Sequence, residues 1–303
     1  MSPSGNSSFA ALRYRDFRLL WLGQIVSVTG SQMQFVAINW HVYVITKSAF
    51  ALGLVGLFRG VPIILCSLVG GVVADAVDRK KLMIVTQSAM LISAALLTVV
   101  TIAGLESVWP IYLLSGLAAA ATAFDTPARQ SLMPALVPAE VFPNAVSLGL
   151  LVFNVATICG PAIAGFLLAE SGPALIYGLN AFSYIAVIIA LIAMKTSGAP
   201  ESTGEQRSAL SLAALKEGLR FVWKTPIIVQ TMTLDFAATF FASATLLLPI
   251  FASERLHVDA RGYGLLAAAP AIGSVITALV LARLGTLRKQ GRLVVGSVAI
   301  FGL

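Results

Sequence analysis

Long apolar runs alternate along the chain with short polar links. A helix needs about 20 apolar residues to cross the hydrocarbon core of a bilayer, and eight runs are long enough. The links between them are rich in glycine, proline and charge, which end one helix and begin the next. The pattern predicts helical membrane spans near residues 18–46, 50–74, 82–104, 108–127, 144–169, 174–194, 226–251 and 262–283.

A ninth apolar run begins after Arg292 and reaches about halfway across a bilayer before the sequence stops. We therefore expect this chain to be a piece of a longer protein. The one long polar segment, 195–225, starts with a Gly, Ser, Pro and Glu composition typical of linkers. Its second half has leucines at helical spacing, which predicts an amphipathic helix on the membrane surface. The expected domains are a cytoplasmic tail (1–17), a six-helix half (18–194), a linker (195–225) and a partial second half (226–303).

Composition agrees with a protein that lives in lipid. The 303 residues are 58% hydrophobic and 11% charged, which predicts an all-α membrane protein. The net charge is +7, and most of the 20 Lys and Arg residues fall on one set of alternate links. This distribution predicts that the N-terminus lies on the cytoplasmic side of the cell (inner) membrane. Nucleic-acid binding would need these bases gathered with aromatics on one soluble face, and we do not expect it.

A charged stretch follows the second span, with the sequence GGVVADAVDRKKL. The order of six spans, a linker and further spans resembles the major facilitator superfamily. The link also resembles motif A of that superfamily, G-x-L-A-D-R-x-G-R-K, through Gly71, Asp75, Arg79 and Lys80. Ala76 and Asp78 replace residues usual in that motif. Together with FDTPARQSLMPALV at 124–137, the variant is most similar to the branch that includes the enterobactin exporter and macrolide efflux proteins. The resemblance implies the major facilitator fold and alternating access.

The resemblance gives this stretch a gating role. Asp75, at the inner end of its span, can accept hydrogen bonds from a helix N-terminus or meet Arg129, while Arg79 and Lys80 anchor the link at anionic lipid. Such a latch would hold the cytoplasmic gate closed until the two halves rock. A plain positive-inside loop also explains the bases, although it does not explain Asp75.

A second family signature lies in the fifth span. Gly160, Pro161 and Gly165 match motif C of the proton-coupled exporters, whereas Ser147 and Ala156 stand where glycine is frequent. Small residues allow close helix approach, and the proline bends the helix. Ordinary helix packing explains the bare residues equally well, so only the resemblance favours export.

Polar residues inside the first span share one helical face. Such groups are costly in lipid unless they face a cavity or a partner, and we expect the stripe to line a central cavity. Contact with substrate and bonding to neighbouring helices remain alternatives, and the last member is either interfacial or a proton carrier. The stripe consists of Gln24, Ser27, Ser31, Gln34 and His41.

Two charges are expected within spans. Asp235 is the only acid that we place deep within a span, and a desolvated carboxyl there could load and release the coupling proton. The alternative is a static pair with Arg59. Arg59 is assigned to the substrate cavity, where it either attracts an anionic substrate or balances Asp235.

Enzymatic chemistry has no support in the sequence, which contains no H-E-x-x-H, no G-x-S-x-G and no Walker loop. Cys66 and Cys159 lie in apolar runs and are expected to be packing residues, and no metal or cofactor is expected. We expect a monomeric, proton-coupled exporter of a drug-like compound or siderophore, with the substrate, protons and membrane lipids as its partners. An importer, or a membrane scaffold or sensor that transports nothing, remains the alternative.

Overall fold

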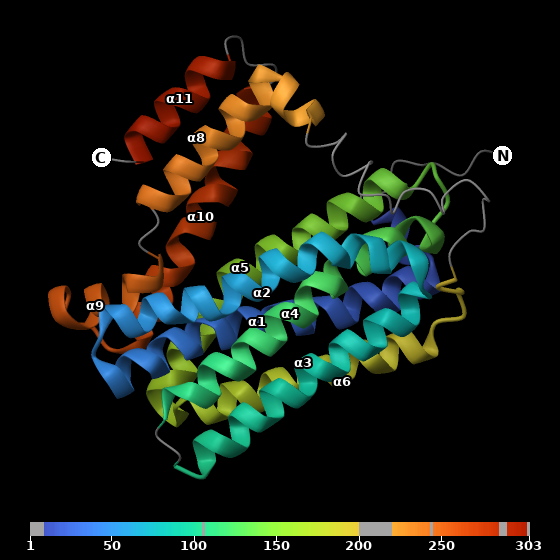
Figure 1. Cartoon of the computed structure of the whole chain (residues 1–303). Coiled ribbons are helices and arrows are strands. Elements are labelled where there is room, and N and C mark those ends of the chain that lie inside the picture. Colours follow the sequence, from blue (N-terminus) through green and yellow to red (C-terminus); the bar gives the residue numbers. More distant parts are fainter. Residues whose placement is uncertain (1–8, 105–106, 200–219, 243–244, 285–289, 302–303) are drawn as a thin grey trace. The chain divides into compact units, whose positions relative to one another are not determined.

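The computed structural model describes residues 9–104, 107–199, 220–242, 245–284 and 290–301 (Figure 1). All regular structure in these ranges is helical, which confirms the all-α class. The amphipathic helix expected in the linker lies mostly outside the described residues. The longer helices are α1 (Arg15–Thr46), α2 (Ala49–Ala76), α3 (Arg79–Ile102), α4 (Val108–Leu132), α5 (Phe142–Ser171), α6 (Pro173–Ala193), α8 (Pro226–Ala242), α10 (Ala260–Leu284) and α11 (Gln290–Phe301).

Six helical stretches in the described part of the chain are long and apolar enough to cross a membrane. They lie in α2, α3, α4 with the turn after it, α5, α6 and α10. The 32-residue α1 is not among them. It carries the polar stripe, and most of the stripe is buried in the protein (Gln24, Ser27 and Gln34).

Two expected spans differ from the helices that form. The fourth continues five residues past its expected end, to Leu132, with Pro127 inside the helix. The seventh is not one regular helix in the described residues, because the 17-residue α8 is followed by a 3-10 turn, the short α9 (Leu248–Ile250) and a π-helical turn (Phe251–Arg255). Pro249 in α9 has no backbone N–H to donate to a preceding turn.

Short polar residues set where the helices begin. The Ser48 side chain accepts from the backbone N–H of Ala51 at the start of α2. Asp78 accepts from the N–H groups of Lys80 and Lys81 at the start of α3, at 3.0 and 3.1 Å. These contacts satisfy N–H groups that no helical turn can reach.

The first six helices pack through five main pairs. α1 lies against α5 and α6, α3 lies against α4 and α6, and α4 lies against α2 (Figure 1). The chain forms two compact units, one of residues 1–200 with 246–275 and one of residues 201–245 with 276–303. The first unit holds α1–α6, the cavity and the motif A and motif C residues described below.

Glycines allow the closest of these contacts. A Cβ on Gly160 would lie 2.6 Å from the Cβ of Gln32 and 3.1 Å from the carbonyl oxygen of Thr29, both in α1. A Cβ on Gly116 of α4 would lie 2.8 Å from the carbonyl oxygen of Phe58 in α2. These carbonyl and Cβ atoms cannot rotate away. The helix backbones therefore approach this closely only because Gly160 and Gly116 have no side chain.

Gly160→Ala should therefore destabilise the protein by about 1–3 kcal/mol through overpacking. The matched control is Gly53→Ala, because a Cβ on Gly53 meets nothing within 4 Å and alanine has the higher helix propensity. Thermal unfolding in detergent micelles compares the two variants. Equal midpoints for both would contradict a close contact between α1 and α5 at Gly160.

Candidate functional site

A cavity of about 60 Å³ lies within the first six helices. It has room for a few water molecules but is far smaller than a typical pocket for a drug-sized ligand. The side chains around it come from α1, α2, α4 and α6. They are Ser31, Gln34, Ile38, Arg59, Ser115, Ala118, Ala119, Thr122, Asn180 and Tyr184.

The polar stripe of α1 divides between this cavity and other contacts. Ser31 and Gln34 line the cavity as predicted. Gln24 accepts a hydrogen bond from the Arg129 guanidinium, and Nδ1 of His41 lies 3.2 Å from the Tyr177 hydroxyl. The stripe therefore bonds to neighbouring helices and in part lines a cavity, and contact with substrate stays a prediction.

A hydrogen-bonded group from α6 forms one wall of the cavity. Nδ2 of Asn180 donates to Oε1 of Gln34 at 2.7 Å and to the Tyr184 hydroxyl at 3.2 Å. The hydroxyls of Tyr184 and Ser31 are 3.0 Å apart. Gly30 leaves space for this group, since a Cβ there would lie 2.6 Å from Oδ1 of Asn180.

Arg59 supplies the charge of the cavity. Its guanidinium lies 4.7 Å from the centroid of the Phe35 ring, in a cation–π contact. Among the described residues it makes no ion pair, and the side chains that line the cavity include no carboxylate. The cavity therefore combines one cation with neutral polar groups.

Asp125 is a buried carboxylate that the sequence analysis did not single out. It lies in α4, is 4% exposed, and its Oδ1 accepts from the Thr86 hydroxyl at 2.9 Å and from Nε2 of Gln87 at 3.0 Å. The expectation that Asp235 is the only deeply placed acid was therefore wrong. The predicted fourth span ends at residue 127, two residues after Asp125, whereas α4 continues to Leu132.

Arg129 lies one turn after Asp125 and contacts a different helix. Its guanidinium donates to Oε1 of Gln24 in α1. In the described part of the chain, two buried amide atoms near this pair have no hydrogen-bond partner. They are Nε2 of Gln24 and Oε1 of Gln87. Two amide groups beside this acid and base are thus left only partly satisfied.

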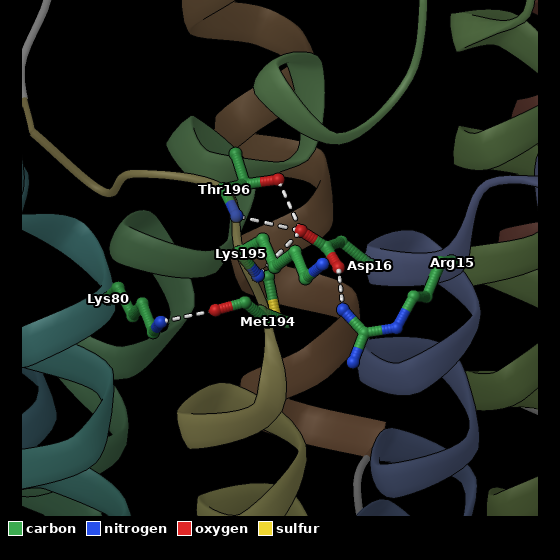
Figure 2. A network of polar contacts seen from close by, with 6 residues as sticks. All are labelled: Arg15, Asp16, Lys80, Met194, Lys195 and Thr196. Carbon is green, nitrogen blue, oxygen red and sulfur yellow. Dashed lines mark hydrogen bonds and ion pairs between the residues drawn. The ribbon is translucent and has the colours of Figure 1, made fainter.

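Two residues of motif A, Arg79 and Lys80, donate hydrogen bonds to the segment that follows α6. Nζ of Lys80 donates to the carbonyl oxygen of Met194 at 2.7 Å (Figure 2), and the backbone N–H of Arg79 donates to the carbonyl oxygen of Gly198 at 2.8 Å. Gly198 packs against Asp78 and Lys80 so closely that a Cβ would clash with both. Arg79 and Lys80 therefore bind the start of the linker.

Asp16 at the start of α1 holds the same segment from the other side (Figure 2). Its Oδ2 accepts from the backbone N–H of Lys195 at 2.9 Å and from both the N–H and the hydroxyl of Thr196, at 2.7 and 2.6 Å. Partial burial raises the pKa of Asp16, but the Thr196 hydroxyl, the two amides and Arg15 lower it. The net pKa lies below the usual value for aspartate.

The other gating residues lie near this segment without joining it. Gly71 is half-buried and Asp75 is exposed, both near the end of α2. Asp75 makes no ion pair among the described residues, where Arg129 instead contacts Gln24. The latch role of Asp75 stays a prediction.

The motif C residues pack against α10 as well as α1. Gly165 and Gly264 meet so closely that a Cβ on Gly165 would lie 2.8 Å from the Cα of Gly264. Nearby, the rings of Trp40 and Tyr263 stack with their centroids 5.3 Å apart, and Arg261 pairs with Glu170. By the predicted orientation this end of the unit faces outward, and these contacts join α1, α5 and the start of α10 there.

Asp235 lies in α8, in the second unit. Its side chain makes no ion pair with a described residue. Its coupling role stays a prediction.

The structure adds Asn180, Tyr184 and Asp125 to the site residues. Asn180, Ser183 and Tyr184 repeat at steps of three and one in the sixth span, so their helical face was visible in the sequence. Asp125 could have been found from its place among alanines, as a charge within an apolar run.

Asp16→Asn should loosen the exit of α6. Hydrogen bonds to a charged acceptor contribute about 1.5–3 kcal/mol, so the amides of Lys195 and Thr196 should exchange with deuterium roughly tenfold faster or more. Arg15→Gln is the control, because its ion pair with Asp16 is half-exposed on the arginine side and contributes little.

The pH dependence of this difference tests the charge of Asp16. Its folded-state pKa is depressed, so the stabilisation is fully present above the unfolded pKa of about 3.9 and is lost as the pH falls through the folded-state value. The difference between Asp16→Asn and the parent protein should therefore persist at pH 5. A difference that had already vanished at that pH would contradict the assignment.

Comparison with known proteins places the chain. The model of the transmembrane secretion effector family matches residues 6–303. Over 294 residues, 95% of this chain and 70% of the relative, it is 26% identical to the enterobactin exporter EntS of Shigella boydii serotype 18. The enterobactin exporter EntS of Citrobacter koseri is 27% identical over the same shares.

A solved structure has the same fold. The crystal structure of a bacterial homologue of the iron transporter ferroportin, in its inward-facing state, superposes with a TM-score of 0.58 at 17% identity. The match covers 88% of this chain and 67% of that one. Since the family model matches nearly every residue, the chain belongs to the transmembrane secretion effector family of the major facilitator superfamily.

Proposed function

We propose that the protein exports a small molecule across the cell membrane by proton-coupled alternating access. The observation that carries the proposal is the polar cavity inside an apolar helix bundle. Polar side chains at such a position are costly unless they serve a pathway or each other. The relatives, named as exporters of enterobactin, support outward transport of a small organic molecule.

Packing at the outward end supports alternating access. The contacts of Trp40 with Tyr263 and of Gly165 with Gly264 join α1, α5 and α10 at one end of the first unit. Transporters of this kind expose a central site to one side of the membrane at a time by rocking one bundle against another. We propose that these contacts separate when the site opens outward.

The motif A grip on the linker supports a role for Arg79 and Lys80 in the same movement. These residues fix the start of the segment that joins the two predicted halves. A movement of one half relative to the other would therefore pull on this segment. We propose that motif A transmits the movement through the linker as well as through the predicted latch at Asp75.

Two carboxylates are candidates for the coupling proton. Asp235, in α8, was proposed from the sequence. Asp125 is supported by its burial and by its hydrogen bonds from the neutral donors Thr86 and Gln87. The Arg129 guanidinium, one turn along α4, also interacts with this carboxylate electrostatically. Both hydrogen bonds go to Oδ1, so Oδ2 is the oxygen at which a proton would bind. We propose that both acids take part in coupling.

Transport in oriented vesicles tests the function. Inverted vesicles that contain the full-length protein should take up enterobactin or a macrolide when a pH gradient is imposed, and vesicles without it should not. Export from cells corresponds to uptake in this orientation. Uptake by right-side-out vesicles alone would indicate an importer, and uptake in neither orientation would favour a protein that does not transport these molecules.

Asp235→Asn and Asp125→Asn should each abolish uphill, pH-driven transport and leave downhill exchange measurable. Each asparagine mimics the protonated acid, and at position 125 its carbonyl can still accept the two hydrogen bonds. Glu140→Gln, at an exposed acid between α4 and α5, should change neither activity. A variant that retains full pH-driven transport would remove that carboxylate from the coupling mechanism.

A further inference from the structure

Arg59, which lines the cavity, has no ion-pair partner among the described residues. A guanidinium inside an apolar bundle is costly unless a negative charge or strong acceptors compensate it. In the described part of the chain Arg59 has neither an ion pair nor a carboxylate beside it in the cavity. Asp125, the one acid that is buried among the described residues, accepts hydrogen bonds from Thr86 and Gln87.

The position of Arg59 leaves its hydrogen-bonding edge available. The guanidinium carbon lies 4.7 Å from the Phe35 ring centroid, and among the described residues no ion pair engages its N–H groups. The N–H groups lie in the plane of the guanidinium and can donate in pairs to a planar oxyanion. The Arg59 donors are therefore available to an anion in the cavity that this residue lines.

Neutral donors lie around the same cavity. Gln34 uses its oxygen to accept from Asn180, which leaves its amide nitrogen as a donor. The Ser31 and Tyr184 hydroxyls share one hydrogen bond, so one of their two hydrogens is left to donate elsewhere. The cavity thus offers a cation, an amide and a hydroxyl, which is the complement of an anion.

We propose that this cavity is an anion subsite and that the transported molecule carries a carboxylate or a similar planar oxyanion. The inference rests on the proposed export function and specifies its substrate class. A cavity of about 60 Å³ accommodates one charged group and not a whole drug-sized molecule. Arg59 binds the anionic end of the substrate, with Gln34, Ser31 and Tyr184 completing its hydrogen bonds.

Fluorine NMR with two matched probes tests the proposal on the purified full-length protein. The probes are 4-fluorobenzoate, which carries the charge, and 4-fluorobenzamide, its neutral counterpart. Binding broadens the fluorine line, and empty micelles provide the background. We expect the parent protein to bind the benzoate at least roughly tenfold more tightly than the benzamide.

Variants locate the site. Arg59→Gln should reduce benzoate affinity roughly tenfold or more, and Arg59→Lys should give an intermediate affinity because it keeps the charge and loses the paired donors. Arg255→Gln, at an exposed base outside the cavity, should bind as the parent does. If Arg59→Gln does not fold, the comparison of the two probes and of Arg59→Lys still decides the question.

The outcomes separate this inference from the proposed function. Equal binding of benzoate and benzamide to the parent protein, or full benzoate affinity in Arg59→Lys and Arg59→Gln, would overturn the anion subsite. Vesicle transport that persists in such a case would leave the export function intact. Selective benzoate binding that depends on Arg59 supports the subsite even where neither enterobactin nor a macrolide is transported.

Discussion

The cost of polar groups in lipid is the constraint on which the rest of the structure depends. α1 brings a face of amide and hydroxyl side chains into a bundle whose other surfaces are apolar, and each must find a partner inside the protein. Gln24 meets Arg129 of α4, Ser31 meets Tyr184 of α6, and Gln34 meets Asn180 of α6. α1 therefore packs between α5 and α6 and reaches α4 through Gln24.

Glycine placement follows from the same constraint. Gly30 makes room for Asn180 beside α1, and Gly160 lets α5 approach α1 on its other side. Close backbones provide dispersion contacts that lipid chains cannot supply selectively. In α1, a glycine that allows close packing and a residue that lines the cavity are thus neighbours in sequence, at Gly30 and Ser31.

The sequence predicted the helices well because span length and apolar composition are local properties. It also assigned Gln24, Ser27, Ser31, Gln34 and Arg59 to one cavity, since α1 has one polar face and Arg59 is a charge within a span. Of these, Ser31, Gln34 and Arg59 line the cavity that the structure contains. It missed Asp125 because the end of α4 was set by hydropathy, whereas the buried face around Thr86 and Gln87 extends further. The partners of Lys80 and Asp16 were also not predictable, because they are backbone groups of the α6 exit and carry no sequence signal.

The central claim is that Arg59 is a half-buried cation in the cavity whose partner is a substrate anion. An experimental structure of the full-length protein in a lipid nanodisc tests it most directly, through the atoms that surround the guanidinium. The account predicts the Phe35 ring, the neutral groups of the cavity and either solvent or a bound anion. A carboxylate of Asp235 or of any other residue within about 4 Å of the guanidinium, the range of an ion pair, would contradict it.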